Sequence, residues 1–345
     1  MMSYTSSYQQ QQCCDEQQQQ QQRLDTITAM NKNEKSGYVT NEYLNDSCMI
    51  TPDDRYKMTE WCFTIVDFCK FQRSTVSICM SYVDRYLAAS VADNNNNNNS
   101  GNLSNVDFQL LVLAALYSSV KIHENEAISP SAVAALSRGV YTSKQIEDME
   151  FALLQKINWR VNPPTSYEYS NRLMGLISEV VDMPQDVQDA VTDLTKFQCE
   201  LAVLYYDFVP VPASHLAVAS LINAMESVCD SATTPSGFSM YQDTCLDMWS
   251  EAACVDIASK QFHDLRMRLY EAVYTKPATG QISRERLAPL VRMVQAAAAD
   301  DEHKIREQQE DSYSPRSVTR SSLTLAPKEA ASFTSMLFSV MSMDI

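Results

Sequence analysis

The sequence is poor in glycine and in long apolar runs, and each shortage excludes a class of protein. It has six glycines in 345 residues, and none forms the glycine-rich loop that holds phosphate in nucleotide-binding enzymes. The longest apolar runs, such as 110–116, are far shorter than the roughly 20 residues that cross a bilayer. No basic and apolar leader opens the sequence, which starts polar and becomes glutamine-rich. We therefore expect a protein without a membrane partner.

Histidine is scarce, and cysteine is present in no metal-binding pattern. Four histidines are scattered, and the ten cysteines lack the paired spacing of zinc sites. Several cysteines fall at helical core positions in a chain too large to need disulfides, which is typical of reduced thiols. There is no nucleophile elbow, and the paired carboxylates at 53–54 and 147–148 are explained by helix starts or solvated faces. We expect no metal, no cofactor and no catalytic residues.

Basic residues are outnumbered, 27 against 43 acidic, which gives a net charge of −16. The imbalance lies mainly in the second half. Residues 53–165 carry 12 acidic and 10 basic side chains, whereas residues 166–275 carry 16 and 5. Nucleic-acid binding needs cations that displace phosphate counterions. We therefore predict no nucleic-acid partner and interpret the acidic face as solvated surface.

The sequence divides into two helical domains between polar tails. Residues 1–50 are low in apolar content and include two glutamine runs, so we predict disorder, because such a segment cannot bury enough surface to offset its ordering entropy. At residues 51–54, Thr-Pro-Asp-Asp combines a capping residue, a proline suited to the first turn and two acids facing the helix dipole. Pro163-Pro164 ends the first unit. We predict domains over 51–163 and 164–276, then a charged helix and a Ser/Thr-rich tail over 277–345.

Helical periodicity runs through both domains. In the first, helices are expected to begin near residues 52, 74, 108, 130 and 143, and the helix 108–121 is apolar almost all round, as a central helix would be. In the second, helices are expected at 166–180, 186–204, 213–229 and 254–274, with a looser segment over 231–237. No alternating strand pattern competes. The predicted fold class is all-α, with disordered N- and C-terminal tails.

One motif spreads over the first domain, and it consists of the following segments: Trp61-Cys62, Tyr82-Val83-Asp84-Arg85-Tyr86-Leu87, Leu113-Ala114-Ala115-Leu116-Tyr117-Ser118-Ser119-Val120-Lys121, Met149-Glu150-Phe151-Ala152-Leu153-Leu154 and Ile157-Asn158-Trp159. These residues resemble the cyclin box, the five-helix module by which cyclins bind and activate their kinases. The resemblance covers roughly residues 54–160 and is looser over the second domain. It implies two tandem five-helix cyclin-like domains. It also implies a regulatory subunit that activates a cyclin-dependent Ser/Thr protein kinase and controls cell-cycle progression.

The resemblance assigns kinase binding to Lys121 and Glu150. In the family, a lysine ending the third helix and a glutamate in the fifth clamp the kinase near its mobile helix. Lys121 ends an otherwise apolar helix, where a cation suits the dipole. Glu150 lies at the edge of an apolar stripe, where a charge needs a partner. Taken from spacing alone, the alternative is an ion pair between these two residues within the chain.

The family's box also carries a shallow apolar patch that docks Arg-x-Leu segments of substrates or inhibitors. Two departures weaken it here. Asp54 replaces an apolar residue that begins the motif, and Thr64 stands where an acid often meets the docking arginine. A missing charged partner costs about 1–3 kcal/mol, so we expect weak or altered docking. The matching positions are Arg55, Met58, Trp61 and Gln109.

Two further assignments rest on short sequences. Asp84-Arg85, a hallmark of the family, is expected to form an internal polar bond that holds the first helices together. Ser314, in a Ser-Pro-Arg sequence of the tail, is a candidate for proline-directed phosphorylation. No nuclear-localisation cluster is present, so we expect a nuclear and cytoplasmic protein that is imported with its partner.

Other functions were weighed against kinase activation. General transcription factors built from two cyclin-like repeats need a basic surface and a zinc ribbon, and Cys13-Cys14 is not a ribbon. A transcription-associated cyclin and a cyclin-fold adaptor that activates no kinase remain alternatives. The presence of both Lys121 and Glu150 favours an activating cyclin. The N-terminal region lacks an Arg-x-x-Leu destruction signal, which favours a G1-like over a mitotic role.

Overall fold

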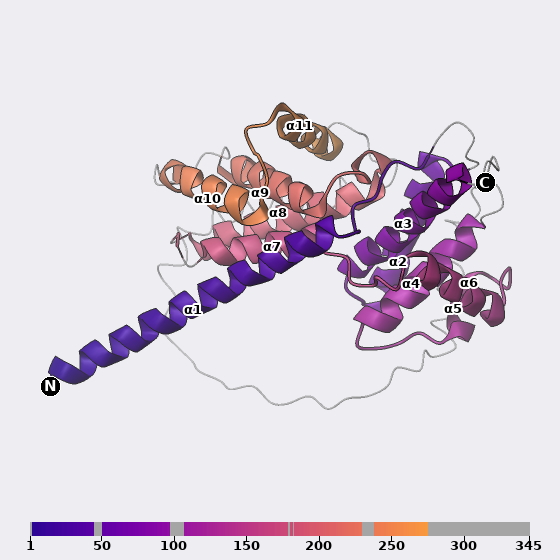
Figure 1. Ribbon diagram of the computed structural model, residues 1–345, viewed down its shortest axis with the longest axis horizontal. Coiled ribbons are helices and arrows are strands. Elements are labelled where there is room, and N and C mark those ends of the chain that lie inside the picture. The colour runs from indigo at the N-terminus through magenta and orange to yellow at the C-terminus, as the bar shows by residue number, and fades with distance from the viewer. Residues whose placement is uncertain are drawn as a thin grey trace, which may run out of the picture. The chain divides into compact units, whose positions relative to one another are not determined.

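The computed structural model describes residues 2–44, 50–96, 107–178, 180–181, 183–229 and 238–274. Over these residues the chain is helical and has no strand, so the predicted all-α class is confirmed. The first five-helix set comprises α2 (Pro52–Cys69), α3 (Ser74–Asn96), α4 (Phe108–His123), α5 (Pro130–Leu136) and α6 (Ser143–Lys156). The second comprises α7 (Ser166–Ile177), α8 (Gln185–Leu204), α9 (Ala213–Cys229), α10 (Phe238–Ala253) and α11 (Lys260–Tyr274), with the short helix η2 (Tyr206–Phe208) after α8. The helix α1 (Met2–Lys35) precedes both sets (Figure 1).

The start signal predicted at residues 51–54 is formed, and the helix that begins at residue 143 has a similar one. The Thr51 hydroxyl accepts a hydrogen bond from the Asp54 amide at 3.1 Å, and the Asp54 carboxylate accepts one from the Thr51 amide at 2.9 Å. Thr142 and Gln145 form the same reciprocal box at the start of α6. Each box satisfies two backbone donors that an open helix end would leave unpaired.

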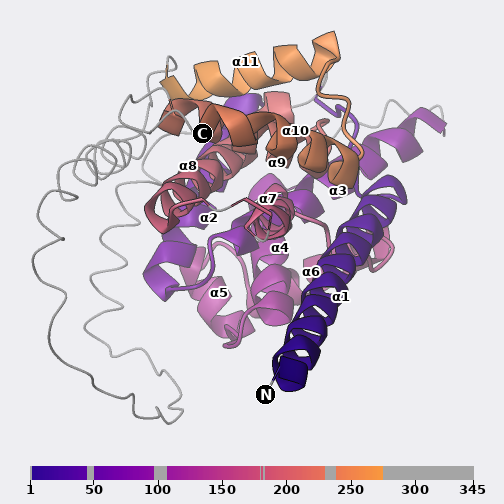
Figure 2. The same ribbon diagram turned by 90° about the vertical axis from the view of Figure 1, so that its left-hand side faces the viewer.

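Each set of five helices surrounds one central helix. All ten residues from Leu111 to Val120 in α4 are buried, and α4 packs against α3 and α6. The small residues along α4 let these neighbours approach, as predicted. In the second set α9 takes the same place and contacts α7, α8, α10 and α11. α11 contacts α8 and α9, and it lies at the upper edge of the second set in both Figure 1 and Figure 2.

Part of the segment predicted to be disordered is folded. α1 covers most of residues 1–50, and its C-terminal half packs against α7 and α10. Ile27, Met30, Asn31 and Glu34 are all buried, at a spacing that places them on one face. The prediction for this part was wrong because average composition hid a short helical stripe, and because glutamine is itself a good helix former. The C-terminal tail, for which a charged helix and a disordered segment were predicted, lies outside the described residues. Ser314 lies in this tail.

The second domain contains a helix that the periodicity did not identify. α10 fills residues 238–253, and α11 begins at Lys260 rather than at residue 254. Cys245, Trp249 and Ala253 are buried and follow each other at four-residue spacing. The Trp249 indole donates to the Leu173 carbonyl at 3.2 Å, which ties α10 to α7. The polar sequence 231–237 before α10, which lies outside the described part of the chain, made this short stripe hard to recognise in the sequence.

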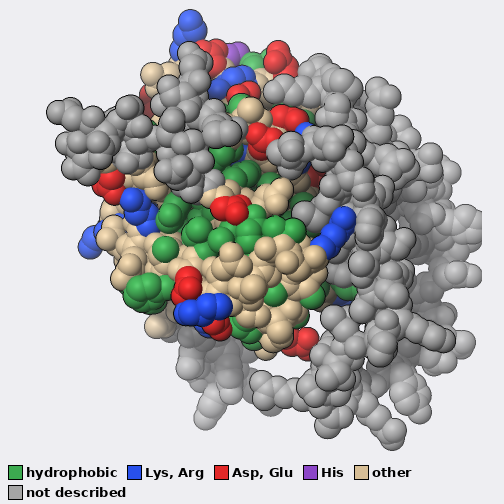
Figure 3. All heavy atoms as spheres, turned by 90° about the vertical axis from the view of Figure 1, so that its right-hand side faces the viewer, with side chains coloured by type: hydrophobic (Ala, Val, Ile, Leu, Met, Phe, Trp, Pro, Cys, Tyr) green, Lys and Arg blue, Asp and Glu red, His purple; other side chains and the backbone are tan. Residues whose placement is uncertain are grey.

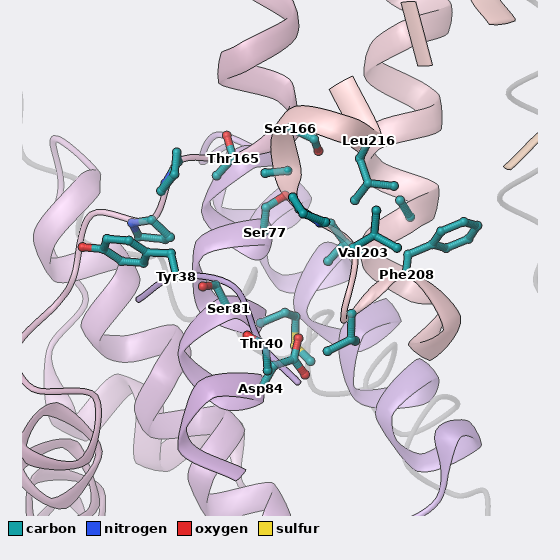
Figure 4. A pocket seen from close by; sticks show the side chains of 18 of the residues that line it. Tyr38, Thr40, Ser77, Ser81, Asp84, Thr165, Ser166, Val203, Phe208 and Leu216 are labelled. Atoms are coloured by element: carbon teal, nitrogen blue, oxygen red, sulfur yellow. The ribbon is translucent and has the colours of Figure 1, made fainter. Parts of the chain in front are cut away.

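A small cavity marks the seam between the two five-helix sets. It encloses about 120 Å³ and is lined from both sides, by Ser77, Ser81 and Asp84 of α3 and by Val203 and Leu216 of α8 and α9 (Figure 4). The segment 38–40, which follows α1, also lines it. Among the described helices, none is long and apolar enough to cross a membrane.

Candidate functional site

The structure brings the two predicted kinase-binding residues together. Lys121 lies in the last turn of α4, and its Nζ is 3.3 Å from each carboxylate oxygen of Glu150 on α6. The Lys121 side chain is 50% exposed, whereas that of Glu150 is 11% exposed. The Ser118 hydroxyl also donates to Glu150, at 3.2 Å. The internal ion pair considered from the sequence is therefore present in the free chain, with the lysine at the surface.

The surroundings of Lys121 favour its charged form. Partial burial alone would lower the pKa of its ammonium group, but the Glu150 carboxylate and Tyr117 outweigh that effect and raise the pKa above its ordinary value. Nζ also lies 5.1 Å from the centre of the Tyr117 ring. Lys121 is therefore a positive charge held in place at the surface by groups on two helices.

Exposed apolar side chains flank this ion pair. Ile122 follows Lys121 and is 41% exposed; Phe151 follows Glu150 and is 56% exposed. Trp159, 59% exposed, stacks edge-to-face on Phe151 with ring centroids 6.5 Å apart. Figure 3, which views the molecule from the right-hand side of Figure 1, shows hydrophobic side chains gathered on this side of the described helices. Exposed apolar groups next to a charged pair in the sequence are consistent with a protein interface.

Sequence reasoning missed Ile122, although an apolar residue at the end of α4 was a usable signal. Phe151 and Trp159 were both part of the motif, but their exposure was not predicted. For Phe151 the signal was an aromatic residue off the inward spacing of α6. Trp159 lies in a turn in which it and Asn158 both have positive φ, 56° and 55°. Sequence patterns do not specify this backbone conformation.

The prediction that Arg55 lines a docking patch is wrong. Its side chain is 2% exposed, and its guanidinium donates to Asp84 at 2.9 and 2.8 Å. It also donates to the carbonyls of Val203 at 2.8 Å and Leu204 at 3.3 Å, in α8. Arg55 therefore joins α2 to α3 and to the second helical set. A guanidinium has five donors in a fixed fork, so it can bind a carboxylate and two carbonyls at once.

The Asp84-Arg85 pair forms internal bonds, as predicted. Asp84 accepts hydrogen bonds from Arg55 and from the Tyr43 hydroxyl, the latter at 2.7 Å. Arg85 donates to the Arg160 carbonyl at 2.8 Å, and burial lowers its pKa to about 10. Both side chains therefore hold the first domain together. Tyr43, which the sequence analysis placed in a disordered segment, is a third member of this network.

The other predicted patch residues offer little surface. Met58 is 6% and Trp61 3% exposed, and only Gln109 is half-buried. The Thr64 hydroxyl donates to the Glu60 carbonyl at 3.1 Å. Glu60 is half-buried, and burial raises the pKa of its carboxyl. Because it lies one turn before Thr64 on the same face of α2, Glu60 is a nearby acid that sequence reasoning overlooked.

The described residues contain no group of three or more His, Cys, Asp or Glu side chains placed to hold a metal ion. The Ser118 hydroxyl that donates to Glu150 is fully buried, so it is not placed to attack a substrate. The exposed Lys121 ammonium group is the part of this pair that a partner can contact.

Comparison with known proteins agrees with this architecture. The chain matches the model for the cyclin N-terminal domain over residues 25–162 and the model for the cyclin C-terminal domain over residues 164–285. The chain therefore belongs to the cyclin family. The first match begins within α1, which is consistent with the packing of that helix. Cyclins are regulatory subunits and not enzymes themselves.

Individual relatives are distant. G2/mitotic-specific cyclin-B1 of Caenorhabditis elegans is 26% identical over 192 residues, which cover 54% of this chain and 50% of that protein. G2/mitotic-specific cyclin-B3 of Mus musculus is 22% identical, and the match covers 56% of this chain and 12% of that protein. G1/S-specific cyclin-E1 of Gallus gallus is also 22% identical, and the match covers 57% of this chain and 48% of that protein. The matched region therefore spans about half of these relatives or less. A viral cyclin from herpesvirus saimiri superposes with a TM-score of 0.49 at 13% identity, covering 72% of this chain and 97% of that one.

Proposed function

We propose that this chain binds and activates a cyclin-dependent Ser/Thr protein kinase and thereby controls cell-cycle progression. The observation that supports this most is the surface ion pair of Lys121 and Glu150, flanked by exposed Ile122, Phe151 and Trp159. Lys121 is half exposed, and the apolar residues Ile122 and Phe151, which are next to the pair in the sequence, are exposed too, so this part of the surface is suited to contact a partner. The names of the relatives include both mitotic and G1/S cyclins.

The mechanism we propose is selection of the kinase's active conformation. Phosphoryl transfer requires the Lys–Glu pair of the kinase and its magnesium ligands to be aligned. A kinase alone keeps the helix that carries this glutamate displaced. Docking of Lys121, Glu150 and the apolar residues against that helix would favour the aligned state. The shift in population is limited by the difference in affinity for the two states.

Each surface residue has a distinct part in this contact. Phe151 and Trp159 supply apolar area at low entropic cost, because their rings already support each other. Lys121 and Glu150 supply hydrogen-bond donors and acceptors that give orientation. Lys121 Nζ can also donate to a partner, because an ammonium group has three donors and this side chain is half exposed.

The proposal also covers the docking of Arg-x-Leu segments and the location of the protein in the cell. If such segments dock, Gln109 and Glu60 are the polar groups near the surface of the predicted patch. Buried Trp61 and Met58 would form its floor, so we expect weak docking. We propose a nuclear and cytoplasmic protein imported with its kinase.

The test is affinity purification of the full chain with its bound kinase, followed by a histone kinase assay and mass spectrometry. Lys121→Ala with Glu150→Ala should abolish the activity and leave the fold intact. The matched control is Lys144→Ala with Asp148→Ala, because these residues form an exposed ion pair on the same helix α6. Equal kinase activity with both double variants would refute the proposal. A bound but inactive kinase would instead support the adaptor alternative.

A further inference from the structure

An exposed serine lies at the junction between α1 and the first domain. Ser36 directly follows the last residue of α1, and its hydroxyl donates to the Asn33 carbonyl at 2.8 Å, within its own turn. Gly37 follows with a φ of 140°, a conformation that residues with a side chain rarely adopt, and residues 39–44 are not helical. The Ser36 hydroxyl is therefore accessible to an enzyme that binds an irregular segment of its substrate.

Arg160, at the end of the first domain, contacts this serine. Its Nη1 donates to the Ser36 carbonyl and lies 3.4 Å from Ser36 Oγ. The guanidinium is also packed against Gly37, where a side chain would collide with it. A guanidinium has five N–H donors, and the described residues use only those of Nη1. Arg160 is thus an exposed cation, held beside a hydroxyl, with donors left for a further acceptor.

Positive charge accumulates behind Arg160. Arg85 is 8% exposed and donates to the Arg160 carbonyl at 2.8 Å. Burial lowers the pKa of Arg85, and the nearby charge of Arg160 adds to this lowering. Asp84, the acid next to Arg85 in the sequence, binds Arg55 instead with both of its oxygens. Two guanidinium groups therefore lie near each other, and within the described part of the chain no carboxylate is bonded to either. An anion placed here would be attracted by both.

The end of α1 gives a phosphate on Ser36 a mixed environment. The C-terminal end of a helix dipole is negative and opposes an anion. Glu34, the carboxylate of the last turn, is already bonded to Ser214 of α9, at 3.0 and 2.6 Å. Lys32 and Lys35 are exposed in the same turn and offset the dipole, which is their ordinary role there. The lysines therefore define no site, and Arg160 is the group that would hold a phosphate.

We propose that Ser36 is a phosphorylation site and that Arg160 binds the phosphate. Ser36 Oγ would attack the γ-phosphorus of ATP held by a Ser/Thr protein kinase. The new O–P bond forms as the bond to the β-phosphate oxygen breaks, ADP leaves, and the hydroxyl proton passes to a carboxylate of that kinase. Phosphate oxygens pair with a guanidinium through two parallel hydrogen bonds. Residue 37 is not proline, so the enzyme is not proline-directed, and Lys32 and Lys35 fit one that favours basic residues before the serine.

The modification would strengthen the connection between α1 and the first domain. α1 packs against α7 and α10 of the second set, whereas Arg160 directly follows Trp159 at the end of the first domain. A charge-assisted pair between residues 36 and 160 would hold these parts of the chain together. The inference depends on this contact alone and holds whether or not the chain activates a kinase.

The first experiment asks whether Ser36 is modified. The full chain is isolated from its own cells with phosphatase inhibitors present, and mass spectrometry locates phosphate on its peptides. Phosphate on Ser36 is expected. Ser131 is the control, an exposed serine whose hydroxyl bonds to Ser129 and not to a guanidinium, and it should carry none. Peptides that cover Ser36 and lack phosphate, in both dividing and arrested cells, would overturn the proposal.

The second experiment asks whether Arg160 binds the phosphate. Phosphoserine is placed at residue 36 of the full chain during synthesis, and phosphorus NMR follows its second ionisation, which ordinarily has a pKa of about 6. A neighbouring cation favours the dianion, so this pKa should be lower in the full chain than in its Arg160→Gln variant. Phosphorylation should also slow amide exchange in residues 37–40 on the order of fivefold, and Arg160→Gln should abolish that effect.

A peptide of residues 30–42 with the same phosphoserine is the reference. It contains Lys32 and Lys35 but lacks Arg160, so its phosphate pKa should resemble that of the Arg160→Gln variant. If that variant does not fold, a lower phosphate pKa in the full chain than in the peptide decides the point. Equal values in all three would overturn the proposal. Neither experiment measures activity of the proposed partner kinase, so failure here is distinguishable from failure of the proposed function.

Discussion

Arg55 and Asp84 form a bidentate ion pair in which both side chains are more than nine-tenths buried. The pair connects α2 to α3, and through the carbonyls of Val203 and Leu204 it also connects the two helical sets. Burial alone would lower the pKa of Arg55, but the carboxylate of Asp84 outweighs it and raises that pKa. The ion pair therefore stays formed at any pH at which Asp84 is ionised.

Removal of Arg55 should destabilise the protein strongly. Arg55→Met leaves the Asp84 carboxylate buried without its cation, and the free energy of unfolding should fall by about 3–5 kcal/mol. Urea unfolding followed by circular dichroism measures the change. Arg55→Met combined with Asp84→Leu should recover part of the loss, since the unpaired charge is gone. A loss below about 1 kcal/mol in the single variant would contradict this account.

Glu34 should hold α1 against the second helical set. Its carboxylate accepts hydrogen bonds from the Ser214 amide at 3.0 Å and the Ser214 hydroxyl at 2.6 Å, at the start of α9. Glu34→Ala removes this cap and should cost about 1–2 kcal/mol. Hydrogen exchange should show faster exchange in residues 24–35. Glu42→Ala, an exposed acid in the following segment, is the control and should leave that exchange unchanged.

Stability should fall at mildly acidic pH because of His215. Burial lowers the pKa of this imidazole below its usual 6.5, despite nearby Glu34, and Lys35 adds to the lowering. Below pH 6.5 the unfolded chain therefore binds more protons than the folded chain, which favours unfolding. Thermal unfolding between pH 7.5 and 5.5 should show a smaller drop in Tm for His215→Gln than for the wild-type chain. Identical drops would show that His215 contributes nothing.

Phe151 and Trp159 should matter for kinase binding more than for stability. Phe151→Ala with Trp159→Ala removes exposed rings, so the free energy of unfolding should change by no more than about 1 kcal/mol. Affinity for the kinase should fall at least about tenfold, since aromatic anchors dominate interfaces. Val140→Ala is the control, because Val140 is 65% exposed on another loop. Unchanged affinity, measured by surface plasmon resonance, would remove these rings from the proposed interface.

The sequence determined the helical elements of the first domain because its signals are local. Capping boxes, a proline pair and apolar stripes act within a few residues, and each predicted helix of that domain is present. The pairing of Lys121 with Glu150 was the alternative that spacing alone offered, and the structure shows this pair. α1 and α10 were missed because their apolar stripes are short and lie within or beside polar, turn-rich sequence.

The tertiary structure decided where those side chains point. Arg55 was predicted at the surface, but the carboxylate that binds it is 29 residues away and the carbonyls 148 and 149 residues away. Asn31 of α1 and Ala252 of α10, which are hydrogen-bonded to each other, are 221 residues apart. No local pattern encodes such contacts, because they depend on how whole helices pack. Local sequence fixes a helix and its apolar face, whereas the fate of a polar side chain depends on partners that only the folded chain supplies.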